Sequence, residues 1–377
     1  MTELQFAPLA PEDTDALQAL LARAFAFAPA DANGWFDAAG RENIRVVRRD
    51  GRVEGGCMVL PMGQYFGGRA VPIGAIAAVG VRTDARRRGI ASRMMSEVLH
   101  ELHHRGVPCS TLYASNAALY RRAGYEPAGA RFSATIRPRE IDSSDRGGAV
   151  RDAGPDDAAM LHAMYAGAVR QRNGHLDRSR YIWDRLHGVR FGVPAHGLVL
   201  LDERGVPEGY LFWRQFRREM FHHLEVTDWV ATTPAAHRRL WSTLSDLRTM
   251  VEDMRCWTAP HDPMLLAVPD PRLELRHEEN WMLRLVDVAG AMRARGFAEP
   301  LRLRLGLRVH DDVLAANDGS FTLHIDGGAA EVERGGTPEL ELDVRALAAV
   351  YSGFASPWSL AALGAVRGNA TALAKLG

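Results

Sequence analysis

A run of arginines that ends in a glycine is the part of the sequence best suited to bind an anion. It reads Arg86-Arg87-Arg88-Gly89, and it lies between a predicted strand that ends at Val81 and a helix that opens with Ile90-Ala91-Ser92. The first N–H groups of a helix lack partners within the helix and lie at the positive end of its dipole, so they bind phosphates. Glycine lets the backbone approach the anion, and arginines add charge-assisted hydrogen bonds. The segment therefore predicts a pyrophosphate site.

Two helices and two hairpins must position this loop. Proline and acids in Ala10-Pro11-Glu12-Asp13 favour a helix start, and one apolar face follows it, made of Leu17, Leu20, Leu21, Ala24 and Phe25. Hairpin turns are predicted at Asp50-Gly51 and Gly67-Gly68. A second amphipathic helix leaves the arginine loop and ends near Gly106, a suitable C-cap.

The loop and the segments around it resemble the coenzyme A motif of the GCN5-related N-acetyltransferase superfamily. That motif is written Gln/Arg-x-x-Gly-x-Gly/Ala, and here it reads Arg86-Arg87-Arg88-Gly89-Ile90-Ala91. A basic loop before a helix can also be a solvated turn. The order of elements favours the superfamily, because a hairpin precedes the loop and a strand (109–114), a short helix (116–123) and a last strand (to Ile136) follow it.

The resemblance implies that acetyl-CoA is the acyl donor, and it assigns the donor contacts. Val79-Gly80-Val81 would hold the pantetheine arm as an added strand would, although an ordinary buried strand has the same pattern. Ser115 and Asn116 would face the thioester, although Asn116 is equally suited to cap the short helix. The implied donor-binding residues are Val79, Gly80, Val81, Arg86, Arg87, Arg88, Gly89, Ile90, Ala91, Ser92, Ser115 and Asn116.

Tyr120, in the stretch Leu119-Tyr120-Arg121-Arg122-Ala123-Gly124-Tyr125, is the candidate general acid. When an amine attacks the thioester, the departing thiolate gains charge, and a positioned O–H can protonate it. The superfamily often places a tyrosine here, and the structural alternative is a phenol packed between helix and sheet. Tyr125 begins the following strand and is expected in the core.

The pattern then begins again after Pro138–Gly148, a polar stretch that predicts a linker. Three features echo the first half in the same order: the helix start at 153–157, the hairpin at 204–209 and the strand end at 230–234. In place of the phosphate loop the second half has His237-Arg238-Arg239-Leu240-Trp241, without a glycine, so donor binding there is not expected. From Leu301 onwards, alternating strands and helices over 346–351 and 360–376 predict a small α+β domain.

Over nearly the full length, the chain resembles the enhanced intracellular survival (Eis) acetyltransferase family. The resemblance also rests on Trp281–Val288 and on Ala315-Ala316-Asn317-Asp318-Gly319. It implies an α+β fold class: tandem acetyltransferase folds with mixed, mostly antiparallel sheets flanked by helices, the second degenerate, and a C-terminal sterol-carrier-like domain. The expected domains are 1–138, 149–290 and 298–377. A homohexamer is implied as well.

In this family the terminal carboxylate takes the proton from the substrate ammonium, which makes Gly377 the candidate general base. A base is needed because an alkyl ammonium has a pKa of about 10.4. Family members usually continue for some further residues, commonly to an aromatic, whereas this chain stops at Ala374-Lys375-Leu376-Gly377. A water chain to a backbone carbonyl or to a carboxylate is the alternative.

Composition excludes some classes of function. The 377 residues are 47% apolar, and 46 basic residues balance 46 acidic ones, which argues against a dedicated nucleic-acid or anionic-membrane binder. We expect a cytoplasmic protein without a signal peptide or a transmembrane helix, because no basic start with an apolar run is present and three scattered cysteines suit a reducing compartment. No metal site is expected, since His103-His104 end a helix and His222-His223 point to opposite faces of a strand.

The function expected from the resemblance is N-acetylation of an aminoglycoside, polyamine or lysine-like amine by direct attack in a ternary complex. Trp35 and Phe36 could line the acceptor pocket or belong to the core, and Asp31 and Asp37 could attract a cationic amine or be merely solvated. Two alternatives stay open: a biosynthetic N-acyltransferase that uses a longer acyl donor on a natural product, and a non-catalytic protein that binds coenzyme A or lipid.

Overall fold

The computed structural model describes residues 4–28, 31–266 and 273–377, with the side chains of 31–33 left aside. It divides the chain into two compact units: the first contains 1–129, 170–179 and 280–377, and the second contains 130–169 and 180–279. The chain passes from one unit to the other within strands β6 (Glu126–Ile136) and β13 (Leu273–Leu285). Each unit is described by itself.

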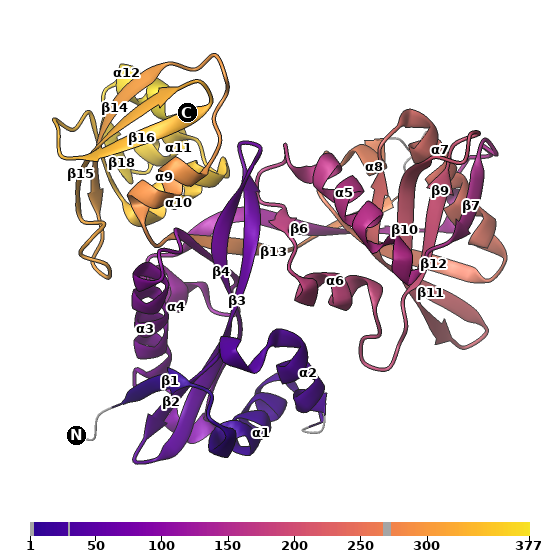
Figure 1. Ribbon diagram of the computed structural model, residues 1–377, viewed down its shortest axis with the longest axis horizontal. Coiled ribbons are helices and arrows are strands. Elements are labelled where there is room, and N and C mark those ends of the chain that lie inside the picture. The colour runs from indigo at the N-terminus through magenta and orange to yellow at the C-terminus, as the bar shows by residue number, and fades with distance from the viewer. Residues whose placement is uncertain (1–3, 29–30, 267–272) are drawn as a thin grey trace. The chain divides into compact units, whose positions relative to one another are not determined.

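The N-terminal half of the first unit is a mixed sheet with helices on both faces (Figure 1). Its strands follow the order β1 (Gln5–Pro8), β2 (Ile44–Arg49), β3 (Arg52–Phe66), β4 (Arg69–Val81), β5 (Cys109–Tyr113) and the end of β13. All neighbours are antiparallel except β4 and β5, which are parallel. The helices are α1 (Thr14–Phe25), α2 (Asp31–Ala39), α3 (Ile90–His104) and α4 (Ala117–Arg122).

Local sequence explains these elements well. The turn between β2 and β3 falls at Asp50-Gly51, where both residues have positive φ, and the turn between β3 and β4 falls at Gly67-Gly68. Helix α1 buries Leu17, Leu20 and Leu21 of its predicted apolar stripe against the sheet, whereas Ala24 and Phe25 at the end of that stripe are exposed. A Cβ at Gly80 of β4 would lie 2.7 Å from Leu20 and Leu21 side-chain atoms, so glycine permits this close packing.

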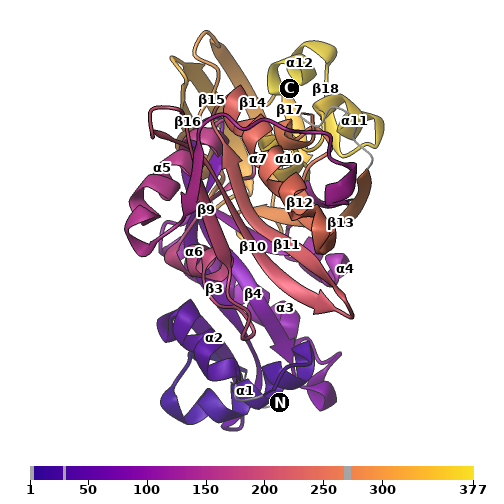
Figure 2. The same cartoon turned by 90° about the vertical axis from the view of Figure 1, so that its right-hand side faces the viewer.

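The second unit repeats the design. Its strands follow the order β6, β12 (Val251–Thr258), β11 (Phe221–Ala231), β10 (Pro207–Arg218), β9 (His196–Leu201) and β7 (Ala149–Asp152), and only β11 and β12 are parallel. Figure 2 shows α5 (Ala158–Val169) and α6 (Arg180–His187) on one side of β10 and β11, with α7 (Pro234–Asp246) on the other. Helix α8 (Pro263–Leu266) follows β12. Helix, sheet and helix therefore stack in the same order as in the first half, as the sequence echoes predict.

The polar stretch predicted to be a linker is held in place. Ile141 is buried in the core of the second unit, the Asp145 carboxylate lies 2.9 Å from Arg238 Nε, and the Ser143 and Ser242 hydroxyls are 2.8 Å apart. The stretch expected to be a linker over Pro138–Gly148 thus packs against the second unit at 141–145. A polar composition does not reveal partners that lie about a hundred residues away. Another segment, β8 (Leu176–Asp177), belongs to the first unit, where it pairs with β3.

The C-terminal domain is a five-stranded sheet packed against helices, within the first unit. Its strand order is β16 (Ala329–Arg334), β15 (Gly319–Asp326), β14 (Leu303–His310), β17 (Leu340–Asp343) and β18 (Val366–Gly368). Its helices are α9 (Val288–Ala294), α10 (Val344–Ser352), α11 (Pro357–Ala362) and α12 (Ala370–Leu376). The helix expected over 360–376 is broken into α11 and α12, because Gly364 adopts a left-handed φ of 72° and β18 follows it.

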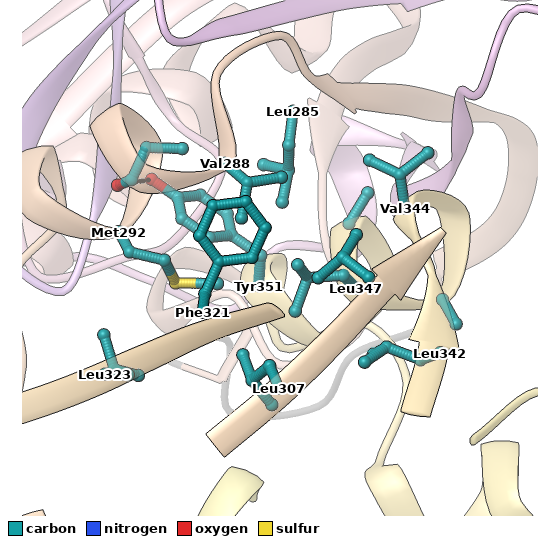
Figure 3. Packing of buried hydrophobic residues seen from close by; sticks show 14 of the residues in the cluster. Leu285, Val288, Met292, Leu307, Phe321, Leu323, Leu342, Val344, Leu347 and Tyr351 are labelled. Carbon is teal, nitrogen blue, oxygen red and sulfur yellow. Dashed lines mark hydrogen bonds between the residues drawn. The ribbon is translucent and has the colours of Figure 1, made fainter. Parts of the chain in front are cut away.

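The interior of this domain is filled by side chains. Figure 3 shows Leu307, Phe321 and Leu323 of the sheet facing residues of α9 and α10, among them Met292 and Tyr351. The same core cluster extends into the N-terminal half, where the Phe66 ring lies 5.0 Å from the Tyr351 ring. The two parts of the first unit therefore share one hydrophobic core. Within the described residues, no helix is both long and apolar enough to cross a membrane.

Candidate functional site

The parallel strands β4 and β5 separate at a bulge, and this leaves one edge of β4 without a partner strand. The two strands pair from Ile73, opposite Cys109, to Ile76, opposite Leu112, and their described residues beyond these do not pair with each other. Beyond it, the register between β3 and β4 shifts, so that two residues of β4 lie opposite Cys57. One of these, Ala78, has a φ of 52°, which is uncommon for a residue with a side chain. The edge of β4 over 77–81 can therefore accept an extended ligand.

The backbone between β4 and α3 forms a concave anion site. Arg87 and Gly89 both adopt left-handed conformations, with φ of 63° and 77°, and alternating conformations of this kind turn successive amides towards one side. Gly89 is the N-cap residue of α3 and has no side chain to cap the helix, so the amides of Ile90, Ala91 and Ser92 stay available. Ile90 is buried and fixes the start of the helix in the core.

The three arginines of this loop are exposed. No ion pair of Arg86, Arg87 or Arg88 is found among the residues that the structure describes, whereas nearby Arg82 pairs with Asp84. Exposed, unpaired guanidinium groups around free helix amides suit a diphosphate. The structure therefore brings together the predicted residues from Val79 to Ser92 as one strand, loop and helix start.

Ser115 and Asn116 follow β5 on the far side of the gap between the two strands. Asn116 Oδ1 accepts the N–H of Leu119 at 3.3 Å, so this side chain caps α4. Asn116 thus caps the short helix, as the sequence also allowed, and this cap uses its side-chain oxygen. Its side-chain N–H groups remain available to a ligand. Ser115 is exposed at the same strand end.

Tyr120 lies on α4 with 4% of its surface exposed, in the core cluster that also contains Cys57 and Ile90, with Val79 packed against it. Its hydroxyl has no hydrogen-bond partner among the described residues. Burial raises the pKa of Tyr120 to about 12, so the phenol stays protonated at neutral pH. A neutral phenol on a buried ring, with no partner among the described residues, is a suitable proton donor.

Tyr125 differs from Tyr120 although the two rings are in contact. It is fully buried, and its hydroxyl lies 2.8 Å from Ser110 Oγ. Ser110 in turn donates to the carbonyl of Gly74 at 2.7 Å. The hydroxyl of Tyr125 is therefore committed to the sheet, which confirms its predicted place in the core.

Aromatic side chains gather where α1 meets α2. The Trp35 ring packs edge-on against Phe25 and Phe27, at centroid distances of 6.0 and 5.5 Å. Phe36 is fully buried, so it belongs to the core, and Asp37 forms an ion pair with Arg41 at 2.7 Å. The side chain of Asp31 lies outside the described residues. Phe25 is about half exposed and Trp35 is partly buried.

Gly377 lies within the C-terminal domain. Its N–H donates to the carbonyl of Leu373 at 3.3 Å, and a Cβ at this position would lie 3.4 Å from Pro357 Cδ. Figure 1 draws the C-terminus beside α12 and β14, away from α4. The structure does not bring Gly377 and Tyr120 together.

The second unit lacks the loop that forms the anion site. Strand β11 passes into α7 through Thr232 and Thr233, and Thr233 Oγ1 caps the helix by accepting the N–H of Ala236 at 3.0 Å. Trp241, in the predicted counterpart of the loop, lies inside α7 and is 1% exposed. A helix start closed by its own cap offers fewer free amides to a phosphate.

Two features of the site could not be foreseen from the motif. The left-handed Ala78 carries no sequence signal, because alanine rarely adopts this conformation and a bulge depends on the register of two strands. Arg284 is fully buried behind α4, yet its sequence context is an ordinary strand. Among the described residues, no group of three or more His, Cys, Asp or Glu side chains is arranged to hold a metal ion.

Comparisons with known proteins identify the kinds of domain in this chain. Residues 5–128 and 174–285 match models of acetyltransferase (GNAT) domains, and residues 288–377 match a sterol carrier protein domain. An uncharacterized N-acetyltransferase of Streptomyces avermitilis is 31% identical over 80% of this chain and 77% of its own length. The N-acetyltransferase Eis of Mycobacterium tuberculosis is 29% identical over 90% of this chain and 86% of its own.

Solved structures show the same arrangement over the whole chain. The crystal structure of a GCN5-related N-acetyltransferase from Anabaena variabilis matches with a TM-score of 0.95 and 30% identity, covering 99% of this chain and 96% of that one. The expected fold class, tandem acetyltransferase folds followed by a sterol-carrier-like α+β domain, is confirmed. The chain therefore belongs to the Eis-like family of GCN5-related N-acetyltransferases.

Proposed function

We propose that this N-acetyltransferase binds acetyl-CoA in the first unit and transfers the acetyl group directly to a primary amine of a small molecule. Aminoglycosides, polyamines and lysine-like amines are the proposed acceptors. The observation that carries the proposal is the gap between β4 and β5, which is bordered by the arginine loop at one end and by Tyr120 behind it. Each part suits a different portion of one ligand.

The donor would be held along its length. The diphosphate would accept hydrogen bonds from the amides of 89–92 and from the arginines of the loop. The pantetheine arm carries amide groups, and these would pair with the free edge of β4 over 77–81 as an added strand does. Ser115 and the Asn116 amide would border the thioester at the end of β5. The same ligand would thus satisfy groups that the protein leaves open.

The chemical step would be a nucleophilic addition to the thioester followed by loss of the thiol. The free amine attacks the acetyl carbon, the C–N bond forms, and the C–S bond breaks as the sulfur takes the electron pair. Tyr120 would donate its proton to this sulfur, and direct transfer needs both substrates bound together. The nitrogen is positively charged after the attack and loses one proton as the amide forms, and this proton would return to the tyrosinate directly or through water.

The attacking amine must first lose a proton, and two acceptors are proposed for it. One is the carboxylate of Gly377, which would have to move from its place beside Leu373 and Pro357 to reach the amine, and the other is a chain of water molecules that leads to a backbone carbonyl or a carboxylate. Blocking the C-terminal carboxylate as an amide, by ligating a synthetic last segment, separates the two. Loss of activity would identify Gly377 as the base, and full activity would favour the water chain.

The filled interior of the C-terminal domain supports an enzyme over a lipid carrier. Its sheet packs directly on α9 and α10 (Figure 3). Residues of the N-terminal half, such as Phe66 and Ile73, share that core. The proposal is tested by thiol release from acetyl-CoA with a panel of aminoglycosides, polyamines and lysine, and by rates with propionyl-CoA and longer donors. Fastest release with acetyl-CoA and one class of amine is expected. No release with any amine would favour a non-catalytic role, and faster release with longer donors would favour the biosynthetic one.

A further inference from the structure

Arg284 is a fully buried arginine that lies directly behind the helix carrying Tyr120. It comes from the end of β13, and its Nη2 donates to both carboxylate oxygens of Asp311, at 2.8 and 2.6 Å. The two side chains are 0% and 1% exposed. The pair joins β13 to the segment that follows β14 of the C-terminal domain.

The rest of the guanidinium faces Gly124, the residue that ends α4. A Cβ on Gly124 would lie 2.8 to 2.9 Å from Arg284 Cζ, Nε and Nη1, so the group lies directly against the glycine backbone. Gly124 has a φ of 85°, and its N–H bonds to the carbonyl of Arg121. The amide of Tyr125 returns to the carbonyl of Tyr120 at 3.1 Å. Arg284 therefore contacts the turn that fixes the end of the helix of Tyr120.

This arrangement is costly, which indicates that stability alone does not explain it. Arg284 Nε and Nη1 are buried and have no hydrogen-bond partner in the part of the chain that the structure describes. Buried polar groups that lack partners destabilise a fold, and an apolar side chain of similar size is often at least as stable as a buried ion pair. The guanidinium instead positions the end of α4. It places a rigid planar group against Gly124 and a positive charge near the carbonyls at the end of the helix.

The C-terminal domain holds this pair from the other side. Asp311 Oδ1 accepts the amides of Val313 and Leu314 at 3.0 and 3.1 Å, and Asn317 Nδ2 donates to Asp311 Oδ2 at 2.9 Å. Asn317 also bonds the carbonyls of Leu285 and Val286. Leu314 enters the same hydrophobic cluster as Tyr120. One network thus runs from the C-terminal domain to the surroundings of Tyr120.

We infer that Arg284, held by Asp311, is a positioning residue for Tyr120, and that the C-terminal domain thereby takes part in proton donation to the leaving thiolate. The inference rests on the proposed role of Tyr120. It assigns the sterol-carrier-like domain a task in this enzyme that needs no lipid: it holds the helix of the general acid against the donor site.

The test is a double-mutant cycle between Asp311→Asn and Tyr120→Phe, measured by steady-state kinetics and by calorimetry of coenzyme A binding. Asparagine keeps the shape and the acceptor for the Val313 and Leu314 amides but removes the charge that holds Arg284. We expect Asp311→Asn to lower kcat by roughly 10- to 100-fold, as small displacements of a catalytic group do, with unchanged affinity for coenzyme A. In the Tyr120→Phe background the same change should cause no further loss.

Asp318→Asn is the matched control, because Asp318 lies on the same segment and pairs with Arg308 at 3.2 Å on the surface. It should leave kcat unchanged. If Asp311→Asn fails to fold, Gly124→Ala displaces the guanidinium from the other side, with Gly106→Ala as a control that has a similar φ and open space around it.

The possible outcomes distinguish a failure of this inference from a failure of the proposed function of Tyr120. A Tyr120→Phe enzyme with undiminished kcat would remove the proposed acid and the inference with it. If Tyr120→Phe lowers kcat, and Asp311→Asn then lowers it further by the same factor as in the wild-type background, Tyr120 stays the proposed acid. Only the positioning role of Arg284 would then be overturned. A loss confined to coenzyme A affinity would overturn it as well.

Discussion

The Tyr120 ring packs edge-on against the Tyr125 ring, at a centroid distance of 6.1 Å and an interplanar angle of 74°. The two phenols are neighbours in one core, but among the described residues only the Tyr125 hydroxyl has a hydrogen-bond partner, Ser110. The hydroxyl of Tyr120 is thus left for a ligand. This difference between adjacent tyrosines is the basis for assigning the general acid.

The two tyrosines should therefore respond differently to loss of the hydroxyl. Tyr120→Phe is expected to lower kcat by about 10²- to 10⁴-fold, the usual contribution of a positioned proton donor, with little change in KM for acetyl-CoA. Tyr125→Phe should keep kcat and lower the free energy of unfolding by about 0.5–1.5 kcal/mol, because it loses a buried hydrogen bond. Kinetics and denaturant unfolding of both variants check this, and equal losses of kcat would contradict the assignment.

Two glycines at opposite ends of α3 test the anion site. Gly89 and Gly106 have φ of 77° and 67°, and a Cβ on either would meet open space. Alanine at each should cost a similar amount of stability, about 1–2 kcal/mol, through left-handed strain. Only Gly89→Ala places a methyl group where the diphosphate would bind, so we expect KM for acetyl-CoA to rise in that variant alone.

Thermal melts and KM values for the two glycine variants provide the comparison. A rise in KM that is the same for both would show that strain in α3, and not contact with the donor, is responsible.

The rate should rise with pH over the alkaline range. Burial raises the pKa of Tyr120 to about 12, so this group keeps its proton where an ordinary tyrosine, near 10, would lose it. The acceptor amine titrates near ~10.4, and kcat/KM for the amine should increase about tenfold per pH unit below that value. A falling limb that begins near pH 8 and vanishes in Tyr120→Phe would contradict the raised pKa.

Acid should weaken the N-terminal half through Asp13. Arg48 donates to this carboxylate and lowers its pKa, and Asp13 is 4% exposed. A lowered pKa in the folded state stabilises the fold above the unfolded pKa of about 3.9, and this contribution is lost as pH falls through the folded-state pKa. Asp13→Asn should therefore lower the free energy of unfolding by about 1–3 kcal/mol at pH 6.

The difference between Asp13→Asn and the wild type should shrink below pH ~3.9, where the carboxyl takes up its proton in the unfolded state before it does so in the folded state. Denaturant unfolding at several pH values measures it. Asp37→Asn, which breaks the exposed pair with Arg41, serves as the control and should change stability by less than about 1 kcal/mol. A pH-independent effect of Asp13→Asn would show that its charge is not involved.

Much of the local structure around the proposed donor site could be predicted because it depends on short-range signals. The helix start at Gly89, the turns at Asp50-Gly51 and Gly67-Gly68, and the cap at Asn116 each depend on a few neighbouring residues, and all lie where they were expected. The echoes between the two halves likewise predicted a second fold of the same kind.

The remaining features depend on contacts between distant parts of the chain. No residue type near Ala78 predicts the bulge, because the bulge arises from the register between β3 and β4. Arg284 and Asp311 are 27 residues apart, and only the packing of β13 against the C-terminal domain makes them a pair. For the same reason the stretch over 141–146 looked like a linker although α7 holds it.

The most direct test of the account is the structure of this protein with coenzyme A bound. We predict the diphosphate on the amides of 89–92, the pantetheine arm along β4 at 77–81, and the sulfur within hydrogen-bonding distance of the Tyr120 hydroxyl. Coenzyme A bound in the second unit, or a sulfur remote from Tyr120, would contradict it.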